Sequence, residues 1–563
     1  MNTANRKIIS LKNAAVAGAL LFFVVLSSAI SFNKSNTWDE PAHILAGYAY
    51  LKDGQDYISP LHHPAFGRLL TGLLPAVALS LDFKTDVLPE QAAGSNFFPY
   101  SLKFLFENKV SGHKILYLSR LAIILTGALL GFYVYLWSSE LWGVKSGFLS
   151  LFLYVLSPSI LGHTSLATTD MPITAFFFIT LFYSYRVAVA GASLKTVIPA
   201  ALFYTLALTS KHTALLAAPL ICAAFTISAY KEKSKAIKAI AYFALFAVLV
   251  YIGIWAVYSF RFKSDGPHYV PLFWDQVLSG GGVKASIIAW VKQARLLPEA
   301  YLYSLAGVIS GSESGRAAFL MGMYSTAGWW YYFITAYLVK TPVAEIVLFS
   351  AAIVYSFSNR ADRAKALWLF APVALIFIVM SKQNVNIGLR HVMPAFPFIL
   401  ALAGYCAKIK TASMKIARYV FYFLLVWYVY AAVSIYPHQL SYFNEIAGGS
   451  KNGHMLLADS NVDWGQDLIG LKKYMDDKKI DTIKFAYFGF SNPKYYGIKY
   501  EYLPSIVIMD IEGVKRAENL KGYVAVSATM LSGVYSPNND FSNFFRKQTP
   551  VDIVGNSILI YKF

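Results

Sequence analysis

Long apolar runs alternate with short polar loops along most of the chain. A helix that crosses a bilayer needs about 17–25 mostly apolar residues, and about eleven segments approach or reach that length. Two neighbouring segments, at 196–209 and 213–230, are also compatible with one re-entrant hairpin, which would leave the orientation of the other spans unchanged. The predicted spans lie at 14–32, 115–137, 146–161, 167–185, 196–209, 213–230, 240–260, 331–357, 366–380, 389–407 and 419–435.

Basic residues gather in alternate loops, which predicts an orientation. Arg6, Lys7 and Lys12 precede the first run, and the loops KEKSKAIK (231–238), NRADRAK (359–365) and KIKTASMKIAR (408–418) fall on the same side if the spans alternate. Lys and Arg collect in cytoplasmic loops. We therefore predict an integral membrane protein of a bacterial cytoplasmic (inner) membrane, with its N-terminus inside and its C-terminus outside.

Three segments without spans are then expected outside the cytoplasm, at 33–113, 261–330 and 436–563. The first contains FGRLLTGLLPAVALSLDF, an amphipathic stretch that is expected to lie in the membrane interface. The last is expected to form a small α/β domain, separate from a transmembrane catalytic domain at 1–435. Its predicted strands lie at 454–459, 481–490, 522–528 and 557–563, and its predicted helix lies at 464–479.

Composition agrees with a membrane protein and excludes other classes. Of 563 residues, 57% are hydrophobic and 14% are charged, with a mean hydropathy of +0.49. The net charge of +19 would suggest nucleic acid in a soluble protein, but here it follows from the cytoplasmic loops. Cys222 and Cys406 both lie in apolar runs, so a disulfide framework is excluded. The tail contains no G-x-G-x-x-G, so it offers no nucleotide site.

Ionisable side chains at membrane depth or at the outer rim are costly, which makes each one a candidate functional group. They combine carboxylates with cationic groups that arrive from several predicted helices. Such a set suits a reaction at the outer leaflet in which a base acts on one substrate and cations hold an anionic phosphate. The candidates are Asp39, Glu40, His43, His63, Arg68, Asp170, Lys211, Lys340, Arg390 and His391.

Several of these residues also have a structural interpretation. Asp39 and Glu40 are compatible with a solvated helix start, Arg390 with an interfacial anchor, and Lys340 with an ion pair to Glu345. Two metal sites are open alternatives. One would use the three histidines His43, His62 and His63, and the other the acidic loop DSNVDWGQD (459–467), which lacks the closing Glu of a calcium loop. No cofactor is otherwise expected.

A set of motifs adds a family resemblance. TWDEPAH, HHPAFGRLL, HTSLATTDMP, GWWYYFITAYLVKTP, NIGLRHVMPAFPF and YFNEIAGG…DSNVDWGQDL occur in this order between about residue 37 and residue 470. Together they resemble the family 39 glycosyltransferases, which include protein O-mannosyltransferases and the lipid A aminoarabinose transferase. The resemblance implies an all-α polytopic GT-C fold that transfers sugars from a polyprenyl-phosphate donor on the outer face of the membrane.

The resemblance also implies roles for individual residues. Asp39 matches the catalytic carboxylate of the first loop, Glu40 completes its Asp-Glu pair, and Asp170 is similar to a second acidic position. HPAFGR (63–68) departs from the family's His-Pro-Pro-Leu-Gly-Lys at Ala65, Phe66 and Arg68.

We therefore expect a glycosyltransferase that inverts the anomeric centre and acts on a lipid, glycan or protein acceptor. Its base would be Asp39. The donor phosphate would be held by Arg390, Lys211 and Lys340, and the acceptor side would be supported by His43, His63, Arg68 and His391. A multi-span transporter and a glycan ligase that uses a polyprenyl diphosphate are the alternatives. No internal symmetry of the kind common in transporters is evident.

Overall fold

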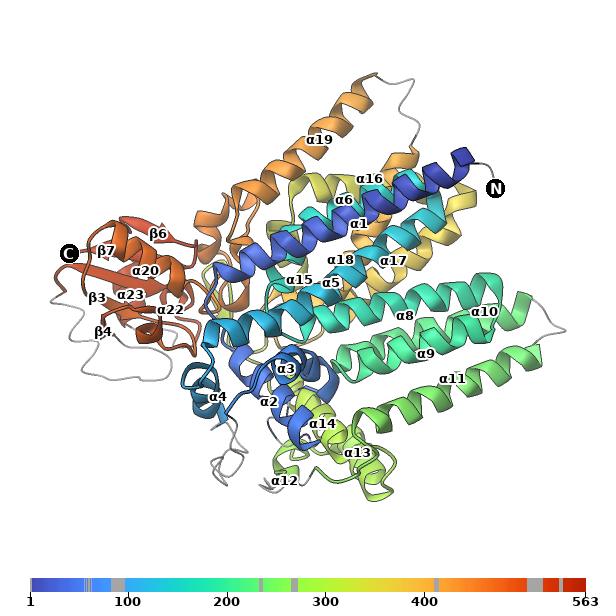
Figure 1. The fold of residues 1–563 in the computed structure, drawn as a ribbon, viewed down its shortest axis with the longest axis horizontal. Coiled ribbons are helices and arrows are strands. Elements are labelled where there is room, and N and C mark those ends of the chain that lie inside the picture. Colours follow the sequence, from blue (N-terminus) through green and yellow to red (C-terminus); the bar gives the residue numbers. More distant parts are fainter. Residues whose placement is uncertain are drawn as a thin grey trace.

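The computed structural model is a helical bundle with a small β-sheet at one end (Figure 1). It describes residues 3–54, 56, 58, 61, 63–82, 97–231, 236–264, 272–409, 415–503, 520–535 and 540–563. His62, one histidine of the metal alternative, lies outside the described residues.

Apolar helices make up the bundle. Within the described ranges, eight helices are long and apolar enough to cross a membrane, or up to ten if each of two bent pairs counts as one span. Exposed apolar side chains such as Leu21, Ile237 and Val426 lie on them, as lipid-facing surfaces require. The eight are α1 (Thr3–Phe32), α5 (Gly112–Trp142), α8 (Asp170–Ala190), η2–α10 (His212–Ala217, Ala218–Lys231), α11 (Ala236–Val257), α17 (Arg360–Met380), η4–α18–η5 (Leu389–Ala395, Phe396–Ala403, Gly404–Lys408) and α19 (Lys415–Ser434).

The remaining three of the eleven predicted spans differ from simple crossings. α6 (Val144–Leu156) and α7 (Pro158–Thr164) are bent by 58°, and α15 (Tyr332–Lys340) and α16 (Val343–Ser358) are bent by 114°. The segment predicted as one span at 331–357 is therefore a sharply bent pair of helices. Pro342 explains this break, because it provides no N–H and restricts the residue before it to extended conformations.

The third exception is α9 (Leu194–Leu208), which has 15 residues. At 1.5 Å per residue it is about 22 Å long, shorter than the hydrocarbon core of a bilayer. It lies beside α8 and α11 in the bundle (Figure 1).

The predicted outer segments hold short helices and a hairpin. The amphipathic stretch forms α3, which packs closely on α2. A Cβ at Gly47 would lie 1.9 Å from the carbonyl oxygen of Arg68, so only glycine permits this approach. The elements are α2 (Glu40–Asp53), α3 (Ala65–Ala78), α4 (Phe97–Phe106), α12 (Trp274–Val277), α13 (Gly282–Gln293), α14 (Glu299–Ser314), β1 (Ala318–Leu320) and β2 (Met323–Ser325).

The C-terminal region contains the predicted α/β fold. Its five strands lie in the order β4-β3-β5-β7-β6, with β3 parallel to both neighbours and β7 antiparallel to both of its own. The predicted strand at 454–459 is wrong, since only Leu457 makes an isolated bridge, to Leu320. The elements are η6 (Gln439–Ser441), η7 (Glu445–Ala447), η8 (Ser450–Met455), η9 (Asp459–Asn461), α20 (Leu468–Asp477), β3 (Ile483–Ala486), η10 (Pro493–Tyr496), β4 (Tyr500–Tyr502), β5 (Tyr523–Ser527), α22 (Ala528–Ser532), α23 (Asp540–Arg546), β6 (Asp552–Val554) and β7 (Ile558–Lys562).

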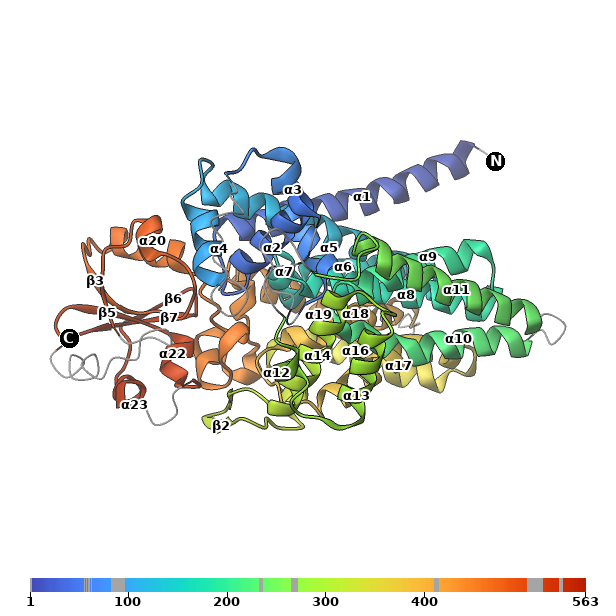
Figure 2. The same ribbon diagram turned by 90° about the horizontal axis from the view of Figure 1, so that it is seen from below.

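Both faces of the sheet are buried, and alternate residues point to opposite faces. On β7, Ile558 and Ile560 pack in a cluster with α20, whereas Leu559 and Tyr561 join the large cluster that continues into the transmembrane helices. Figure 2 shows the sheet at the end of the bundle opposite to the N-terminus. The sheet is therefore packed directly on the end of the bundle that lies opposite to the N-terminus.

Candidate functional site

An aspartate at the start of α2 faces an arginine from a distant helix. Asp39 is the N-cap residue of α2, but its side chain makes no capping hydrogen bond. Its Oδ2 lies 3.0 Å from Nη1 of Arg390, and the two side chains are 25% and 11% exposed. Asp39 is thus directed toward a cation and open to solvent, which a simple helix start does not require.

A second carboxylate and a second cation extend this pair. Asp170, at the first residue of α8, accepts a hydrogen bond of 2.7 Å from Nζ of Lys211 and lies 3.9 Å from Arg390 Nη1. Asp170 is 1% exposed, whereas Lys211 is 14% exposed. Asp39, Arg390, Asp170 and Lys211 therefore form one chain of alternating charge, which we term the four-charge cluster.

The loop DSNVDWGQD supports this cluster. The guanidinium of Arg390 lies over the indole of Trp464 at 4.3 Å, a cation–π contact that fixes its plane. Backbone hydrogen bonds join this loop to the segment before α2, from Trp38 N–H to the carbonyl of Trp464 (2.9 Å) and from Ser35 N–H to that of Gln466 (3.0 Å). Two motifs that lie more than 400 residues apart in the sequence thus pack together next to the four-charge cluster.

Buried nitrogen atoms without partners lie on residues of this region. Nε of Arg390, Nε2 of His391 and Nδ1 of His163 are all buried and have no hydrogen-bond partner within the described part of the chain. The charges of Lys211, Arg390 and Asp170 all act on His391 and His163. Unsatisfied buried polar atoms are costly, and the unused N–H of Arg390, whose partner Asp170 also binds the ammonium of Lys211, is suited to an anion.

Two histidines flank the four-charge cluster. The rings of His43 and His63 meet edge to face at 5.0 Å, and His63 Nδ1 lies 3.3 Å from the hydroxyl of Thr169, next to Asp170. Burial lowers the pKa of His43 to about 4, against the opposing effect of Asp39. His43 is therefore a neutral imidazole at physiological pH.

Glu40 does not face the cluster. Its side chain is fully buried, and its oxygens accept two 2.7 Å hydrogen bonds from Arg120 of α5 and one each from the N–H groups of Thr37 and Ala167. With both oxygens satisfied, Glu40 ties α2 to α5 and to the loop before α8. This geometry supports a structural role for Glu40, and its predicted place in a catalytic pair stays a prediction.

Two more predicted site residues are engaged elsewhere: Arg68, expected on the acceptor side, and Lys340, expected at the phosphate. Arg68 forms a buried ion pair with Asp56 at 2.7 Å. The ammonium of Lys340 donates to the backbone carbonyls of Leu440, Tyr442 and Asn461, which uses its three protons. Lys340 is therefore a structural cross-link at the 114° bend, and the structure supports neither a phosphate contact nor an ion pair with Glu345.

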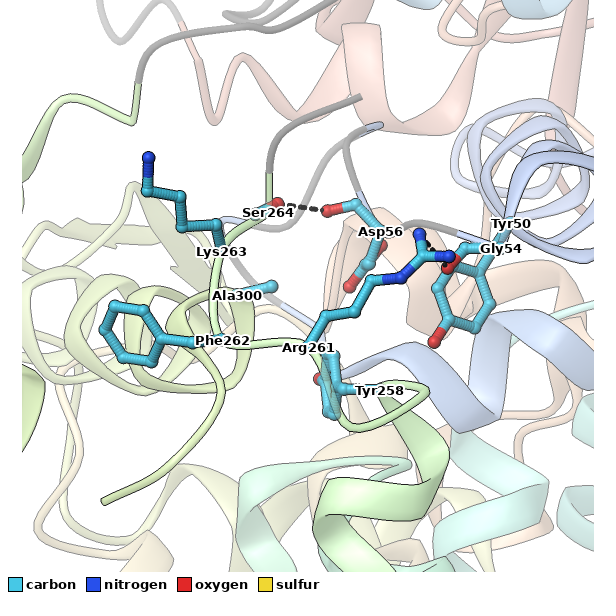
Figure 3. A pocket seen from close by; sticks show the side chains of 9 residues that line it. All are labelled: Tyr50, Gly54, Asp56, Tyr258, Arg261, Phe262, Lys263, Ser264 and Ala300. Atoms are coloured by element: carbon cyan, nitrogen blue, oxygen red, sulfur yellow. Dashed lines mark hydrogen bonds between the residues drawn. The ribbon is translucent and has the colours of Figure 1, made fainter. Parts of the chain in front are cut away.

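A small hollow lies beside the Arg68–Asp56 pair, between the end of α2, the end of α11 and α14 (Figure 3). It is lined by Tyr50, Tyr258 and Arg261, and Ser264 donates to the backbone carbonyl of Asp56. Its volume of about 10 Å³ is at the lower limit for a single water. It is therefore too small to hold a substrate.

The metal alternatives find no support in the geometry. Among the residues that the structure describes, no group of three or more His, Cys, Asp or Glu side chains could hold a metal ion. In the acidic loop, Asp463 accepts from the N–H groups of Gly465 and Thr529, whereas Asp467 pairs with Lys34. The carboxylates of Asp463 and Asp467 thus interact with different groups of the protein.

Sequence analysis missed three residues of this region. Arg120 carries a charge inside a predicted span, a signal that pointed to a buried partner. Trp464 stood within a quoted motif, but its stacking on Arg390 had no signal in the sequence. Asp459 was considered only as a calcium ligand, and its pKa responds to the charges of Arg390 and Asp39.

Comparisons with known proteins find likeness only among solved structures. No family model matches the chain, and no curated protein matches its sequence. ArnT from Cupriavidus metallidurans bound to undecaprenyl phosphate is 12% identical, with 98% of this chain and 97% of that chain covered and a TM-score of 0.48. The oligosaccharyltransferase AglB from Archaeoglobus fulgidus, in complex with an inhibitory peptide and a dolichol-phosphate, is 13% identical, with 94% and 72% covered and a TM-score of 0.45.

At such identities and TM-scores, these likenesses do not carry an activity over to this chain. The case for a function therefore rests on the four-charge cluster and its surroundings.

Proposed function

We propose that this chain is a membrane glycosyltransferase that moves a sugar from a polyprenyl-phosphate donor to an acceptor on the extracytoplasmic face. The observation that carries the proposal is the four-charge cluster, in which a partly exposed carboxylate, Asp39, pairs with Arg390, whose Nε has no partner among the described residues, and Asp170 joins Arg390 to a second cation, Lys211. A base beside a phosphate-binding group is what transfer from a lipid phosphate needs. The motif resemblance supports the same reaction.

The reaction would be a single displacement. The acceptor oxygen (or nitrogen) attacks the anomeric carbon of the donor sugar while Asp39 takes its proton. The bond from the anomeric carbon to the phosphate oxygen breaks, and its electron pair leaves with the lipid phosphate. One displacement inverts the anomeric centre, by analogy with inverting glycosidases.

Arg390 and Lys211 are the proposed phosphate ligands. A guanidinium matches phosphate oxygens bidentately, and Arg390 is already oriented by Trp464. Arg390 holds Asp39 at 3.0 Å in this structure. An arriving phosphate would compete for that guanidinium and leave Asp39 free to act on the acceptor. Asp170 would keep Lys211 and Arg390 in place.

The direct test is to incubate the purified protein with a panel of polyprenyl-phosphate sugars and a membrane extract as acceptor. Release of polyprenyl phosphate together with a new glycosylated product is expected from the wild type and not from Asp39→Asn. Lys499→Met, which changes an exposed surface residue, serves as the matched control. Absence of lipid phosphate release with every donor of the panel would refute the proposal.

A further inference from the structure

Three aromatic side chains form a series beside Asp39. The ring of Trp38 stacks on Phe488 at 5.0 Å and 21°, and Phe488 stacks on Tyr535 at 5.9 Å and 15°. Trp38 comes from the segment before α2, whereas the other two belong to the C-terminal domain. Phe488 is buried, but Trp38 is half-buried and Tyr535 is 36% exposed. The series therefore presents aromatic surface at the edge of the four-charge cluster.

A third carboxylate lies at the far end of this series. The hydroxyl of Tyr535 donates to Oδ2 of Asp459, and the backbone N–H of Asp459 donates to the hydroxyl of Thr529 at 3.1 Å. Asp459 has a φ of 56°, in the left-handed region that residues with side chains rarely adopt. Such strained residues cluster at binding and active sites.

Asp459 belongs electrostatically to the same site as Asp39. Burial raises the pKa of Asp459, the guanidinium of Arg390 opposes that effect, and the carboxylate of Asp39 adds to it. The charge of Arg390 thus acts on Asp459 as well as on its ion-pair partner Asp39. The mechanism proposed above uses Asp39 but assigns no task to Asp459, Tyr535 or the aromatic series.

We infer that Trp38 and Tyr535, joined by the buried Phe488 and lying on the side of Asp39, form the acceptor subsite of the proposed transferase and that this subsite takes a carbohydrate. Asp459, which is buried with both oxygens in hydrogen bonds, positions the Tyr535 hydroxyl. The inference rests on the proposed function for the reaction itself. It also assigns a task to the C-terminal domain, which would supply part of the acceptor site.

The chemistry of the lining favours a sugar over the other acceptors. One face of a pyranose ring presents C–H groups, which pack on aromatic rings, and its rim presents hydroxyl groups, which donate to carboxylates. Aromatic side chains supply large contact areas with a defined geometry, and a few placed polar groups fix orientation. An anionic acceptor would place its charge against Asp39.

The test uses saturation-transfer NMR on the full-length protein in detergent. The probes are the neutral methyl glycosides of glucose, galactose, mannose and N-acetylglucosamine. At least one should receive saturation on its ring protons from the wild type. Trp38→Ala and Tyr535→Ala should weaken that binding by about ten-fold, roughly the worth of one aromatic contact. Tyr535→Phe, which keeps the ring, should retain most of it.

Matched controls are available on exposed aromatic residues. Trp290→Ala on α13 and Tyr502→Ala on β4 remove exposed rings of the same types and should leave binding unchanged. Tyr535 is partly exposed, so Tyr535→Ala keeps the test available even if Trp38→Ala does not fold.

The outcomes separate this inference from the proposed function. Saturation of no glycoside, or binding that persists in both alanine variants, overturns the carbohydrate subsite, even if the wild type releases polyprenyl phosphate from its donor. Saturation that depends on Trp38 and Tyr535, with no release from any donor, supports the subsite and contradicts the proposed donor instead.

Discussion

Two adjacent carboxylates, Asp39 and Glu40, have different surroundings. Successive residues of a helix point about 100° apart, so the first turn of α2 directs them to different neighbours. Glu40 points inward to Arg120, where both of its oxygens are satisfied. Asp39 points to Arg390 and remains 25% exposed. Of the pair, only Asp39 is placed to meet a substrate.

Asp39→Asn should lower turnover by about 10²–10⁴-fold, because a positioned base contributes that much. Donor binding should change little or become slightly tighter, since the asparagine carries no charge that competes with the phosphate for Arg390. Glu40→Gln should instead lower the thermal stability, because it weakens a buried pair with Arg120, where breaking such a pair costs about 3–5 kcal/mol. Turnover, donor affinity and melting temperature of both variants check this division.

Near-normal turnover in folded Asp39→Asn would contradict the proposed base. A large loss of turnover in Glu40→Gln at unchanged stability would identify Glu40 as the base instead of Asp39. The proposed class of reaction would stay the same.

Arg390→Ala should raise the donor KM strongly or lower turnover, since its loss removes a bidentate phosphate ligand and leaves Asp39 and Asp170 without their shared cation. Arg390→Lys should recover only part of the activity, because an ammonium is a point charge without the planar fork. Donor kinetics over a concentration series measure both effects. Normal donor kinetics in folded Arg390→Ala would identify Arg390 as an interfacial anchor.

At the scale of elements, the C-terminal end of α1 is fixed to the region that follows α19 by a buried ion pair. Lys34 follows α1 directly, and its ammonium pairs with Asp467, the residue before α20. Both side chains are almost completely buried. Burial alone would raise the pKa of Asp467, but Lys34 and His438 outweigh it and hold that pKa well below its usual range.

Lys34→Met should therefore change how stability depends on pH. In the wild type, the pKa of Asp467 is depressed below its unfolded value of about 4. The ionised carboxylate therefore stabilises the folded state above about pH 4, and this stabilisation is lost as the pH falls further. In Lys34→Met the buried carboxylate lacks its cation and its pKa rises. Stability should then fall as the pH rises from about 4 toward neutral, with a loss of about 3–5 kcal/mol.

Melting temperatures between pH 4 and pH 8 measure this reversal of slope. Lys499→Met removes the exposed partner of Asp481 and should leave the curve unchanged, because exposed pairs contribute little. A Lys34→Met curve parallel to that of the wild type would show that the pair does not fix α1 to the region that follows α19.

The elements themselves were largely predictable from local pattern. Apolar runs predicted the helices of the bundle, and alternation predicted β3, β5 and β7. The strands β4 and β6, of three residues each, are too short to give a pattern. The strand predicted at 454–459 failed because its apolar residues pack within a series of short 3-10 helices. The break at Pro342 was visible in the sequence but was read as part of one span.

The sequence predicted which residues belong to the site but not which of them contact each other. Asp39, Asp170, Lys211 and Arg390 were recognisable as costly charges near the membrane. Which of them meet depends on long-range packing. Glu40 and Arg120 are 80 residues apart, and no local signal assigned them to each other.

For the whole molecule, the arrangement of ends agrees with the predicted alternation. Figure 1 shows the N-terminus and the ends of α10 and α11 that meet near the KEKSKAIK loop at one end of the bundle, and the C-terminal sheet at the other. The four-charge cluster lies at the sheet end, since Arg390 stacks on Trp464. The side of the membrane that the sheet faces therefore decides where the reaction occurs.

A reporter enzyme that is active only outside the cytoplasm should be active when fused after Tyr436, at the end of α19, and silent when fused after Lys231 or Lys408. The physical reason is that basic loops stay in the cytoplasm, and Lys231 and Lys408 border two of them. A second reporter that is active only in the cytoplasm, fused at the same three positions, is the control and should give the inverse pattern. Activity of the first reporter after Lys231 and silence after Tyr436 would place the four-charge cluster on the cytoplasmic side. The donor would then have to present its sugar there, and an extracytoplasmic transferase would be ruled out.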